Sequence, residues 1–409
     1  MDADELTAWL RLALTPGVGN DAARRLLAAL GLPQAIFGQS AAALRQIVSP
    51  AQASALAAPP EGLDAQVQAT QTWLAGAEDG QGRALITLGD PRYPASLLAI
   101  EDPPPMLYLV GQIRLLNAEK NTDKSLAGKA LSATDTAANR WPEPALAVVG
   151  SRNPTPQGKQ DARQFARTLT EAGLAVVSGL ALGVDGAAHE GALAACDENA
   201  PATRLATLAV VGTGIDRVYP RQHRALAHRI AAQGLIVSEY PIGTPPLPAN
   251  FPKRNRLIAG LTRGTLVVEA ARQSGSLITA RLASEQGKEV FAIPGSIHSP
   301  QSRGCHALIR QGAKLVETAE DILEELRWPY APVADKAAPP PQESSGAGGQ
   351  NSDESALLEA LGADPVGLDA LQARTGLDTA TLQARLLTLE LDGRVGRLPG
   401  GLFQRLGQA

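Results

Sequence analysis

Short apolar runs between residues 145 and 326 constrain the fold of this chain more than any other feature. The runs read ALAVVG, LAVVSG, LATLAVVG, LIVSE, TLVVEA, EVFAIPG and KLVET, and stretches with helical periodicity separate them. Strands that are apolar throughout are typical of a parallel sheet whose two faces are both covered by helices. The sequence therefore predicts an α/β domain over residues 145–330, built on an extended Rossmann-like parallel sheet.

The rest of the chain divides by composition into four further parts. Residues 1–110 are rich in Ala and Leu and helical in pattern, and 111–144 read as an inserted polar loop. A Pro/Ala/Gly/Ser-rich stretch, 331–353, is typical of a flexible linker. Residues 354–409 show three helical patterns and then a Gly-rich pair of short strands, which predicts a winged-helix domain.

Two parts outside the predicted sheet could also contact nucleic acid. The segment LTPGVGNDAARRLLAALG (14–31) has the Gly-Val-Gly turn of a helix-hairpin-helix, in which backbone N–H groups can contact phosphate. The same pattern also serves packing alone. In the winged helix, Thr379, Gln383 and Arg385 could bind duplex DNA, but 353–395 has about as many acids as bases. Duplex binding and a protein contact remain alternatives there.

Whole-chain properties limit the class of protein. The formal net charge is −4, which argues against a protein coated in positive charge but allows a local basic patch. The only cysteines, Cys196 and Cys305, lack metal-ligand spacing, so we expect no disulfide framework, metal or cofactor. The N-terminus is acidic, and no uninterrupted apolar run is long enough to span a membrane. We expect a soluble cytoplasmic protein.

Small residues follow the predicted strands, where ligands of doubly wound sheets bind. Gly150, Ser151 and Arg152 follow the first run, and Ser178 and Gly179 follow the second. Glycine allows a ligand to approach the backbone, and the next helix N-terminus favours phosphate. Turns between strands and helices also need Gly and Ser for their own geometry. Both interpretations stay open on this pattern alone.

A dense basic segment favours a chain of phosphates over a single one. Between residues 217 and 263 there are eight basic residues and one acid, Glu239. The basic residues are Arg217, Arg221, Arg224, Arg229, Lys253, Arg254, Arg256 and Arg263. Exposed helix faces normally intersperse acids with bases, so this excess predicts a nucleic-acid-binding surface that includes Arg221 and Arg224.

An enzyme acting on a nucleotide or a phosphoribosyl group is the alternative from a different functional class. Asp185 and His189 of GVDGAAHEGAL lie four residues apart on one predicted helix face, as an acid/base pair would. A first-turn Asp also stabilises a helix, and the His could simply pack. The Gly212-Thr213-Gly214 turn has Arg217 in place of the third Gly of a dinucleotide motif, so that signal is weak.

Seven motifs carry a resemblance to a known family. VVGSRNPTPQG, SGLALGVDGAAHEGAL, VVGTGIDRVYP, LIVSEYPIG, FPKRNRLIAGL, VVEAARQSGSLITARLA and VFAIPGSI followed by GCHALIRQGAKLV occur in the order and approximate spacing of the DprA (Smf) family. The resemblance implies a binding protein, not an enzyme. It implies that single-stranded DNA is bound and protected, and that RecA recombinase is loaded during natural transformation. The PGG-x-GT motif of Rossmann-like phosphoribohydrolases is absent.

The resemblance also implies positions for the DNA contacts and for a homodimer. Residues expected around the DNA are Gly150, Ser151, Arg152, Ser178, Gly179, Lys253, Arg254, Asn255, Arg256, Ser274, Gly275 and Ser276. The homodimer would use a helix predicted within 302–316, through Cys305, Leu308 and Ile309. The alternative is that the helix predicted over 318–326 covers this surface within the same chain.

Overall fold

The computed structural model describes residues 1–76, 81–116, 141, 144–197, 200–329, 350–362, 365–398 and 400–406. The polar loop predicted over 111–144 therefore lies mostly outside the described residues, and so does most of the linker predicted over 331–353. Within the described part, no helix is both long enough and apolar enough to cross a bilayer.

The strands of the described residues form one large sheet and one small sheet. The large sheet has nine strands in the order β1-β2-β6-β5-β4-β3-β7-β8-β9, and the strands from β3 to β9 run parallel to one another. These parallel strands are β3 (Ala145–Val149), β4 (Ala175–Ser178), β5 (Thr207–Val211), β6 (Leu235–Ser238), β7 (Gly264–Val267), β8 (Glu289–Ala292) and β9 (Lys314–Leu315). The predicted extended Rossmann-like sheet is confirmed.

Helices cover both faces of this sheet. They are α8 (Pro156–Glu171), α9 (Val184–Ala194), α10 (Arg224–Gln233), α11 (Asn250–Gly260), α12 (Ser276–Glu285), α13 (Arg303–Arg310) and α14 (Ala319–Glu325), with 3-10 turns η3 (Arg221–His223) and η4 (Pro300–Ser302). Helices α8, α9, α10 and α14 pack on one face, and α11, α12 and α13 pack on the other. Because β3 to β7 are buried on both sides, their continuous apolar sequences are explained.

The loop that follows β3 shows how sequence sets the start of a helix. Thr155 caps α8 by accepting a hydrogen bond from the N–H of Gly158, at 3.0 Å. Pro156 occupies the first helical position, where its missing N–H costs nothing. The short segment between β3 and this cap therefore has little freedom, and it lies at the edge of the sheet where ligands of this fold bind.

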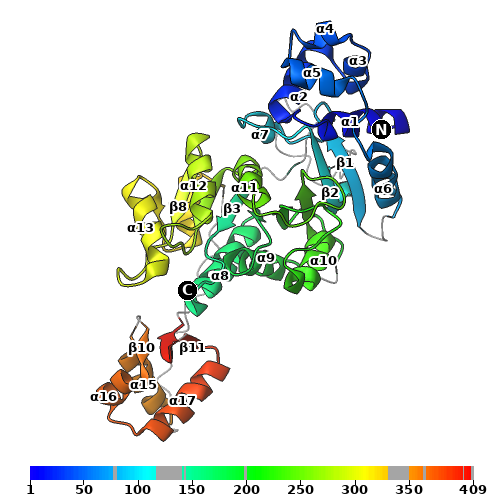
Figure 1. Cartoon of the computed structure of the whole chain (residues 1–409). Helices are drawn as coiled ribbons and strands as arrows, with labels where there is room; N and C mark the ends of the chain where they lie inside the picture. The colour runs from blue at the N-terminus through cyan, green and yellow to red at the C-terminus, as the bar shows by residue number, and fades with distance from the viewer. Residues whose placement is uncertain are drawn as a thin grey trace, which may run out of the picture.

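The N-terminal part differs from the sequence expectation. Six helices are present: α1 (Ala3–Leu14), α2 (Asn20–Leu30), α3 (Pro33–Phe37), α4 (Ala41–Leu44), α5 (Pro50–Leu56) and α6 (Leu63–Ala75). The rest of 1–110, expected to be helical, instead forms the strands β1 (Gly82–Thr87) and β2 (Met106–Gly111), with one short helix α7 (Ala95–Leu98) between them. The turn η1 (Ile113–Leu116) lies at the start of the segment predicted as a polar loop. Strand β2 pairs antiparallel with β6, so this part extends the central sheet. Figure 1 shows α1 to α5 gathered beyond the β1 edge.

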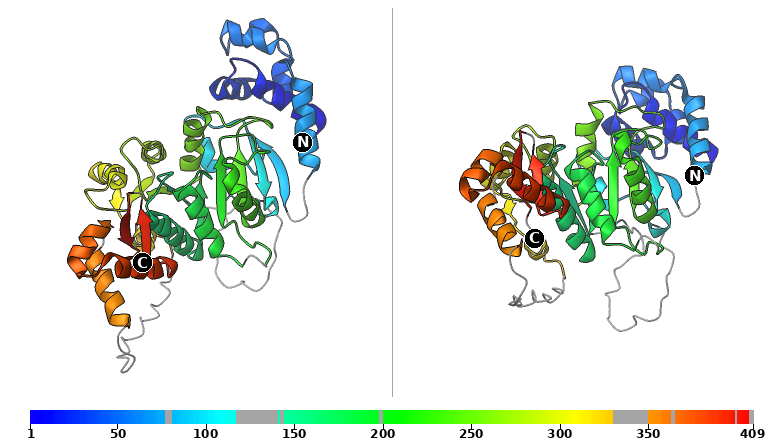
Figure 2. Two further views of the ribbon diagram at one scale, coloured as in Figure 1. Left: turned by 60° about the horizontal axis from the view of Figure 1, so that its bottom comes forward. Right: turned by 90° about the horizontal axis from the view of Figure 1, so that it is seen from below.

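The C-terminal residues form the predicted winged helix. Its elements are α15 (Gln350–Leu361), β10 (Val366–Gly367), α16 (Leu368–Thr375), α17 (Thr379–Leu391), β11 (Val395–Leu398) and β12 (Leu402–Arg405). Strands β11 and β12 pair as the antiparallel wing. Figures 1 and 2 place this domain beside α8, at the far end of the molecule from the N-terminal helices.

Candidate nucleic-acid interface

A groove of about 710 Å³ opens at the carboxyl ends of β3 and β7. These two strands are neighbours, but the chain leaves β3 toward β4 on one side and returns to β7 on the other. This is the switch point at which ligands bind in doubly wound sheets. Much of its lining comes from residues 150–153 after β3, the start of α11, and residues 271–276 up to the start of α12, and Tyr219 of the loop after β5 also lines it.

The segment after β3 is held by backbone contacts and directs Arg152 outward. The N–H of Ser151 donates to the Glu269 carbonyl at 2.7 Å, and its Oγ accepts from the N–H of Asn153 at 3.1 Å. A Cβ on Gly150 would lie 2.7 Å from a Val184 methyl group, so only glycine fits between these segments. Since Arg152 is exposed at the groove, its guanidinium is available to an anionic ligand.

Two aromatic rings stand next to Arg152. The Phe251 and Tyr219 ring centroids are 5.6 Å apart, and the Arg152 guanidinium carbon lies 5.8 Å from the Phe251 centroid. Tyr219 is 48% exposed, so its ring is open to solvent. Exposed rings beside arginine are the arrangement on which nucleic-acid bases stack. Neither ring was expected from the sequence, although both lie within the basic segment 217–263 in a chain with only five Phe and five Tyr.

The other wall of the groove carries polar groups at the start of α12. The hydroxyls of Ser274 and Ser276 are 2.7 Å apart, and Asn255 donates its side-chain amide to the Gly275 carbonyl at 3.3 Å. The N–H groups of Ser276, Leu277 and Ile278 bond to the Ser274 hydroxyl and to the Ser274 and Gly275 carbonyls. The two hydroxyls still lie at the positive end of the helix, which favours phosphate. Lys253 is exposed on the neighbouring helix. Asn255, Ser274 and Ser276 line the same groove as Arg152, whereas Lys253 lies outside its lining, between Pro252 and Arg254 on α11.

Arg254 forms the floor of the groove and is only 4% exposed. It donates from Nη1 to the Val210 carbonyl, and its guanidinium packs on Gly179, where a Cβ would lie 1.9 Å from Nη1. Burial raises the pKa of Asp185, and the charge of Arg254 offsets part of that rise. Burial likewise lowers the pKa of Arg254. These buried groups shape the groove from below.

Ser178 supports the same floor instead of lining the groove. Its hydroxyl donates to the Val148 carbonyl at 2.6 Å, and the residue is fully buried. Gly179 is also buried, beneath the guanidinium of Arg254. The two residues expected around the DNA from the second strand therefore lie one layer deeper than Ser151 and Arg152.

Arg256 lies in a buried ion-pair network away from the groove lining. Its Nη2 bonds to the Glu239 carboxylate, and its Nε lies 3.3 Å from Asp102 Oδ2. The Arg256 side chain is 11% exposed and that of Glu239 is 4% exposed. Because Asp102 belongs to the N-terminal part, this network ties α11 and the end of β6 to the segment before β2. The geometry gives Arg256 a structural role.

Arg221 and Arg224 face a different hollow. It has a volume of about 620 Å³, and Trp73, Arg83 and His228 also line it. The loop after β5 separates it from the groove, because Val218 lines this hollow whereas the next residue, Tyr219, lines the groove. The basic segment thus divides into groove residues, buried residues and residues at a second surface.

The Asp185/His189 pair does not form an accessible acid/base site. His189 is fully buried, and its Nδ1 lies 2.7 Å from Thr207 Oγ1. Burial lowers the pKa of His189 to about 3, so the ring is neutral at physiological pH. Asp185 borders the groove but is paired electrostatically with Arg254. In the part of the chain that is described, no group of three or more His, Cys, Asp or Glu could hold a metal ion.

The helix expected to form a homodimer contact is partly a core element. Cys305 is fully buried and its thiol contacts the Val267 and Val268 carbonyls at 3.6 Å, so it cannot meet a partner directly. Leu308 and Ile309 are partly buried against the same core. The alternative cover is wrong, because α14 packs on the opposite face of the sheet, with α8. Ile309 borders a shallow hollow beside the exposed Ile297 and Leu315.

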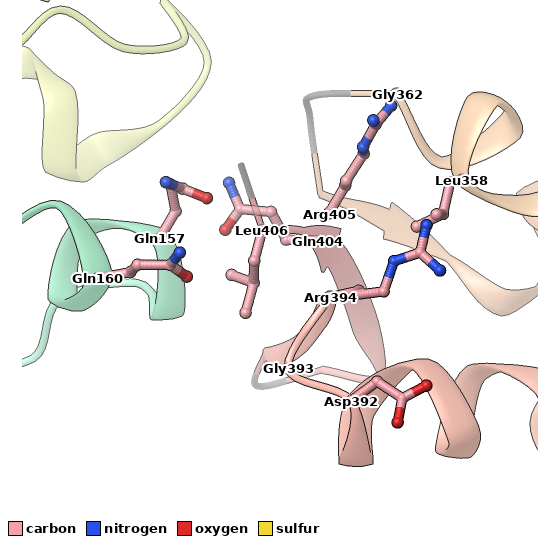
Figure 3. A pocket seen from close by; sticks show the side chains of 10 residues that line it. All are labelled: Gln157, Gln160, Leu358, Gly362, Asp392, Gly393, Arg394, Gln404, Arg405 and Leu406. Atoms are coloured by element: carbon pink, nitrogen blue, oxygen red, sulfur yellow. The ribbon is translucent and has the colours of Figure 1, made fainter. Parts of the chain in front are cut away.

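The winged helix contacts the central domain through its wing. A cavity of about 870 Å³ lies between α8 and the wing, and Figure 3 shows Gln157 and Gln160 of α8 facing Gln404 and Leu406 across it. A Cβ on Gly396 would lie 2.6 Å from the Pro156 ring, so the wing and α8 approach closely there. Of the residues proposed for duplex binding, Thr379 and Gln383 are exposed and Arg385 is half-buried.

Comparisons with known proteins agree with this architecture. The family profile of DNA recombination-mediator protein A matches residues 136–327, and that of the DprA winged helix domain matches 335–401. Protein Smf of Escherichia coli is 37% identical over 349 residues, which cover 84% of this chain and 82% of that protein. DNA processing protein DprA of Streptococcus pneumoniae is 41% identical over 239 residues, 58% of this chain and 73% of its own length.

A solved structure supports the same relationship. The X-ray structure of DNA processing protein A (DprA) from Streptococcus pneumoniae aligns with a TM-score of 0.60 and 33% identity. The alignment covers 80% of this chain and 98% of that one.

Proposed function

Because this chain belongs to the DprA (Smf) family of DNA recombination mediators, we propose that it binds single-stranded DNA in the groove between β3 and β7. The observation that carries the proposal is the combination, in one groove, of Arg152 with the Phe251 and Tyr219 rings, beside which Lys253 is exposed on α11. Cations neutralise the backbone phosphates, and rings accept unpaired bases of any sequence. A free nucleotide would use only part of this surface.

Each wall of the groove makes a different kind of contact with the bound strand. Arg152 and Lys253 contact phosphates, and the Ser274 and Ser276 hydroxyls at the positive end of α12 bind a further phosphate. A base stacks on Phe251, with the planar guanidinium of Arg152 holding the ring of the next base or its phosphate. Binding on this basis is weakly dependent on sequence and strongly dependent on salt.

Binding of deoxythymidine oligonucleotides of increasing length, compared with thymidine monophosphate and with duplex DNA, tests this proposal. We expect affinity to rise steeply with length until the groove is filled, measured by fluorescence anisotropy. A matched pair of variants locates the site: Phe251→Leu, which removes the ring, should weaken binding, and Phe37→Leu, far from the groove, should not. Equal affinity for monophosphate and long oligonucleotides would contradict the proposal.

We further propose that the bound strand is protected and that RecA is loaded onto it in the cytoplasm, as the DNA recombination-mediator profile supports. A pull-down with RecA, with and without single-stranded DNA, tests the contact. Without DNA, the Phe251→Leu variant should retain as much RecA as the parent chain. With single-stranded DNA present, the variant should retain less RecA than the parent, which would separate the DNA contact from the RecA contact. No retention of RecA in either sample contradicts loading by direct contact.

Self-association through the α13 end of the sheet is the third part of the proposal. Ile309, with the 74% exposed Ile297 and the 44% exposed Leu315, makes the apolar part of a hollow at the edge formed by β9, which Arg272, Arg303 and Arg310 also line. Ile309→Arg places charge there twice in a two-fold dimer. Sedimentation should show a folded monomer for this variant and a dimer for the parent chain. A parent that remains monomeric at tens of micromolar contradicts this part.

A further inference from the structure

Glu269 lies just after β7 and holds both ends of the segment that carries Arg152. Its main-chain carbonyl accepts a hydrogen bond from the N–H of Ser151 at 2.7 Å. Its carboxylate accepts two more from Thr155, one from the N–H to Oε2 at 2.8 Å and one from the hydroxyl to Oε1 at 2.6 Å. Glu269 is not among the residues that line the groove, so any effect that it has on a ligand passes through these neighbours.

The carboxylate of Glu269 lies at the start of α8. Thr155 is the N-cap of this helix, and its hydroxyl accepts from the N–H of Gly158 at 3.0 Å, which leaves the hydroxyl proton for Glu269. Pro156, the first helical residue, has no N–H to offer. A helix N-terminus is the positive end of the helix dipole, so a carboxylate is favoured there. The chain thus supplies its own anion to α8.

Gly158 makes room for that anion. A Cβ on this residue would lie 2.4 Å from the Glu269 carboxyl carbon and 2.6 and 2.7 Å from its two oxygens. Gly158 has no positive φ and belongs to a regular helix, so the close approach of the carboxylate is what requires glycine here. Gly158 is the last residue of VVGSRNPTPQG, the first of the family motifs, and this contact gives that glycine a physical reason.

A phosphate occupies the equivalent place in many doubly wound proteins. In them the strand at the switch point is followed by a helix whose N-terminus binds the phosphate of a nucleotide. Here β3 and α8 are that strand and that helix. Because the Glu269 carboxylate already lies at the start of α8, a ligand phosphate would meet a negative charge there. Phosphates have to bind further along the groove, where Arg152 is exposed.

We propose that Glu269 is a positioning residue for the groove. Its carboxylate substitutes for a ligand phosphate at α8 and fixes residues 151–155 in the conformation that directs Arg152 toward the bound DNA. Without the carboxylate, the Thr155 end of this segment loses both of its bonds to the segment after β7. A segment that is not fixed beforehand has to be ordered when DNA binds, which lowers affinity. This role rests on the proposed binding of single-stranded DNA, whereas the anion at α8 does not.

Removal of the carboxylate and its replacement from solution test the proposal in the full-length chain. Glu269→Ala deletes the Cγ, Cδ and both oxygen atoms, which together have the size and charge of acetate. Glu269→Gln removes the charge but fills the space. Glu171→Ala, on the same helix but at an exposed position, is the matched control. Affinity for a deoxythymidine oligonucleotide and thermal unfolding without DNA are measured for each protein in sodium acetate and in sodium chloride of equal concentration.

We expect both Glu269 variants to bind the oligonucleotide roughly tenfold more weakly than the parent chain in sodium chloride. Acetate should restore most of that affinity to Glu269→Ala and should also raise its unfolding temperature. The parent chain, Glu269→Gln and Glu171→Ala should differ much less between the two salts, because none of them has a vacant place for an anion at α8.

Gly158→Ala provides an independent measurement. Exchange of glycine for alanine within a helix normally stabilises the helix. Here the added methyl group would displace the carboxylate, so we expect the opposite, a lower unfolding temperature and weaker DNA binding. In the Glu269→Ala background the methyl group meets no carboxylate, and the same exchange should no longer lower either quantity.

Two results would overturn the proposal. One is oligonucleotide affinity that both Glu269 variants keep while the parent chain binds. The other is a loss of affinity that acetate restores no better than chloride does, because the deleted group would then not act as an anion at α8. If Glu269→Ala folds in neither salt, the affinities of Glu269→Gln and Gly158→Ala decide. A parent chain that binds no oligonucleotide contradicts the DNA proposal instead, and the acetate effect on unfolding, measured without DNA, keeps the two failures distinct.

Discussion

Lys253 and Arg256 lie three positions apart in one helix, yet the structure gives them different surroundings. Lys253 is exposed beside the groove, whereas Arg256 is buried against Glu239 and Asp102. The two residues look alike in the sequence because the acids that pair with Arg256 come from distant segments. The positive charge of this segment could be predicted from the sequence. Whether a particular basic side chain faces a ligand or is buried in the core depends on tertiary contacts.

Truncation of the two side chains should therefore affect different properties, DNA binding for Lys253 and stability for Arg256. Lys253→Ala should leave stability within about 0.5 kcal/mol and weaken DNA binding by about 1–3 kcal/mol. Arg256→Ala should lower the free energy of unfolding by about 3–5 kcal/mol, because it leaves Glu239 buried without its partner. Urea unfolding and fluorescence anisotropy measure the two effects.

A double variant controls for the buried pair. Arg256→Met with Glu239→Gln removes both charges and should cost less stability than Arg256→Ala alone. If Arg256→Ala instead kept full stability and lost DNA affinity as Lys253→Ala does, the structural role of Arg256 would be wrong.

His189 should make stability depend on pH. Thr207 Oγ1 donates to the Val176 carbonyl at 2.7 Å, so His189 Nδ1 must donate to that hydroxyl, and the buried ring is neutral. Its pKa is lowered to about 3 by burial, below the ordinary 6.5. Below pH 6.5 the imidazole is protonated in the unfolded chain while it is still neutral in the folded chain. The free energy of unfolding therefore falls by up to about 1.4 kcal/mol per pH unit. Above pH 6.5 this contribution is constant.

Urea unfolding between pH 7.5 and pH 5 measures this effect. Comparison with His189→Asn isolates it, because Asn keeps a donor near Thr207 but does not titrate. The parent should lose stability faster than the variant as pH falls. Parallel pH profiles of the two proteins would show that His189 does not titrate in this way.

At the scale of elements, the sequence predicted the parallel strands well but missed β1 and β2. Strands such as β3 are apolar throughout because both faces are buried, and that signal is visible locally. Strands β1 and β2 lie in a segment dominated by Ala- and Leu-rich helices. They pair with each other, and the pairing of β2 with β6 joins positions more than a hundred residues apart. Nothing local marks them as part of the sheet.

This arrangement predicts how the chain can be divided. A fragment of residues 145–329 lacks β2, which leaves the β6 edge unpaired and exposes core residues that pack against Leu107 and Leu109. We expect that fragment to aggregate. Residues 1–329 retain the whole sheet and should fold and bind single-stranded DNA. Size-exclusion chromatography and circular dichroism check both, and a monodisperse folded 145–329 fragment would contradict the single extended sheet.

At the scale of the whole molecule, the groove lies where the segment after β3 meets residues that follow β5, β6 and β7. Of the residues expected around the DNA, Arg152, Asn255 and the Ser274–Ser276 turn line the groove, because residues after parallel strands gather at one edge of the sheet, whereas Lys253 lies beside it. The sequence did not predict the Phe251 and Tyr219 rings, since their approach depends on how the loop after β5 folds over α11. It also did not predict that the wing packs on α8, which only the assembled domains define.

The salt dependence of single-stranded DNA binding tests the central claim most directly. Affinity for one oligonucleotide should be measured from low to high NaCl for the parent, Arg152→Ala, Lys253→Ala and the control Arg167→Ala, whose arginine is exposed on α8 and paired with Glu171. The two groove variants should bind more weakly and lower the slope of log affinity against log salt by roughly 0.7 for each phosphate that the variant no longer neutralises. The control should match the parent. Groove variants that keep the parent's affinity and slope would contradict DNA binding in this groove.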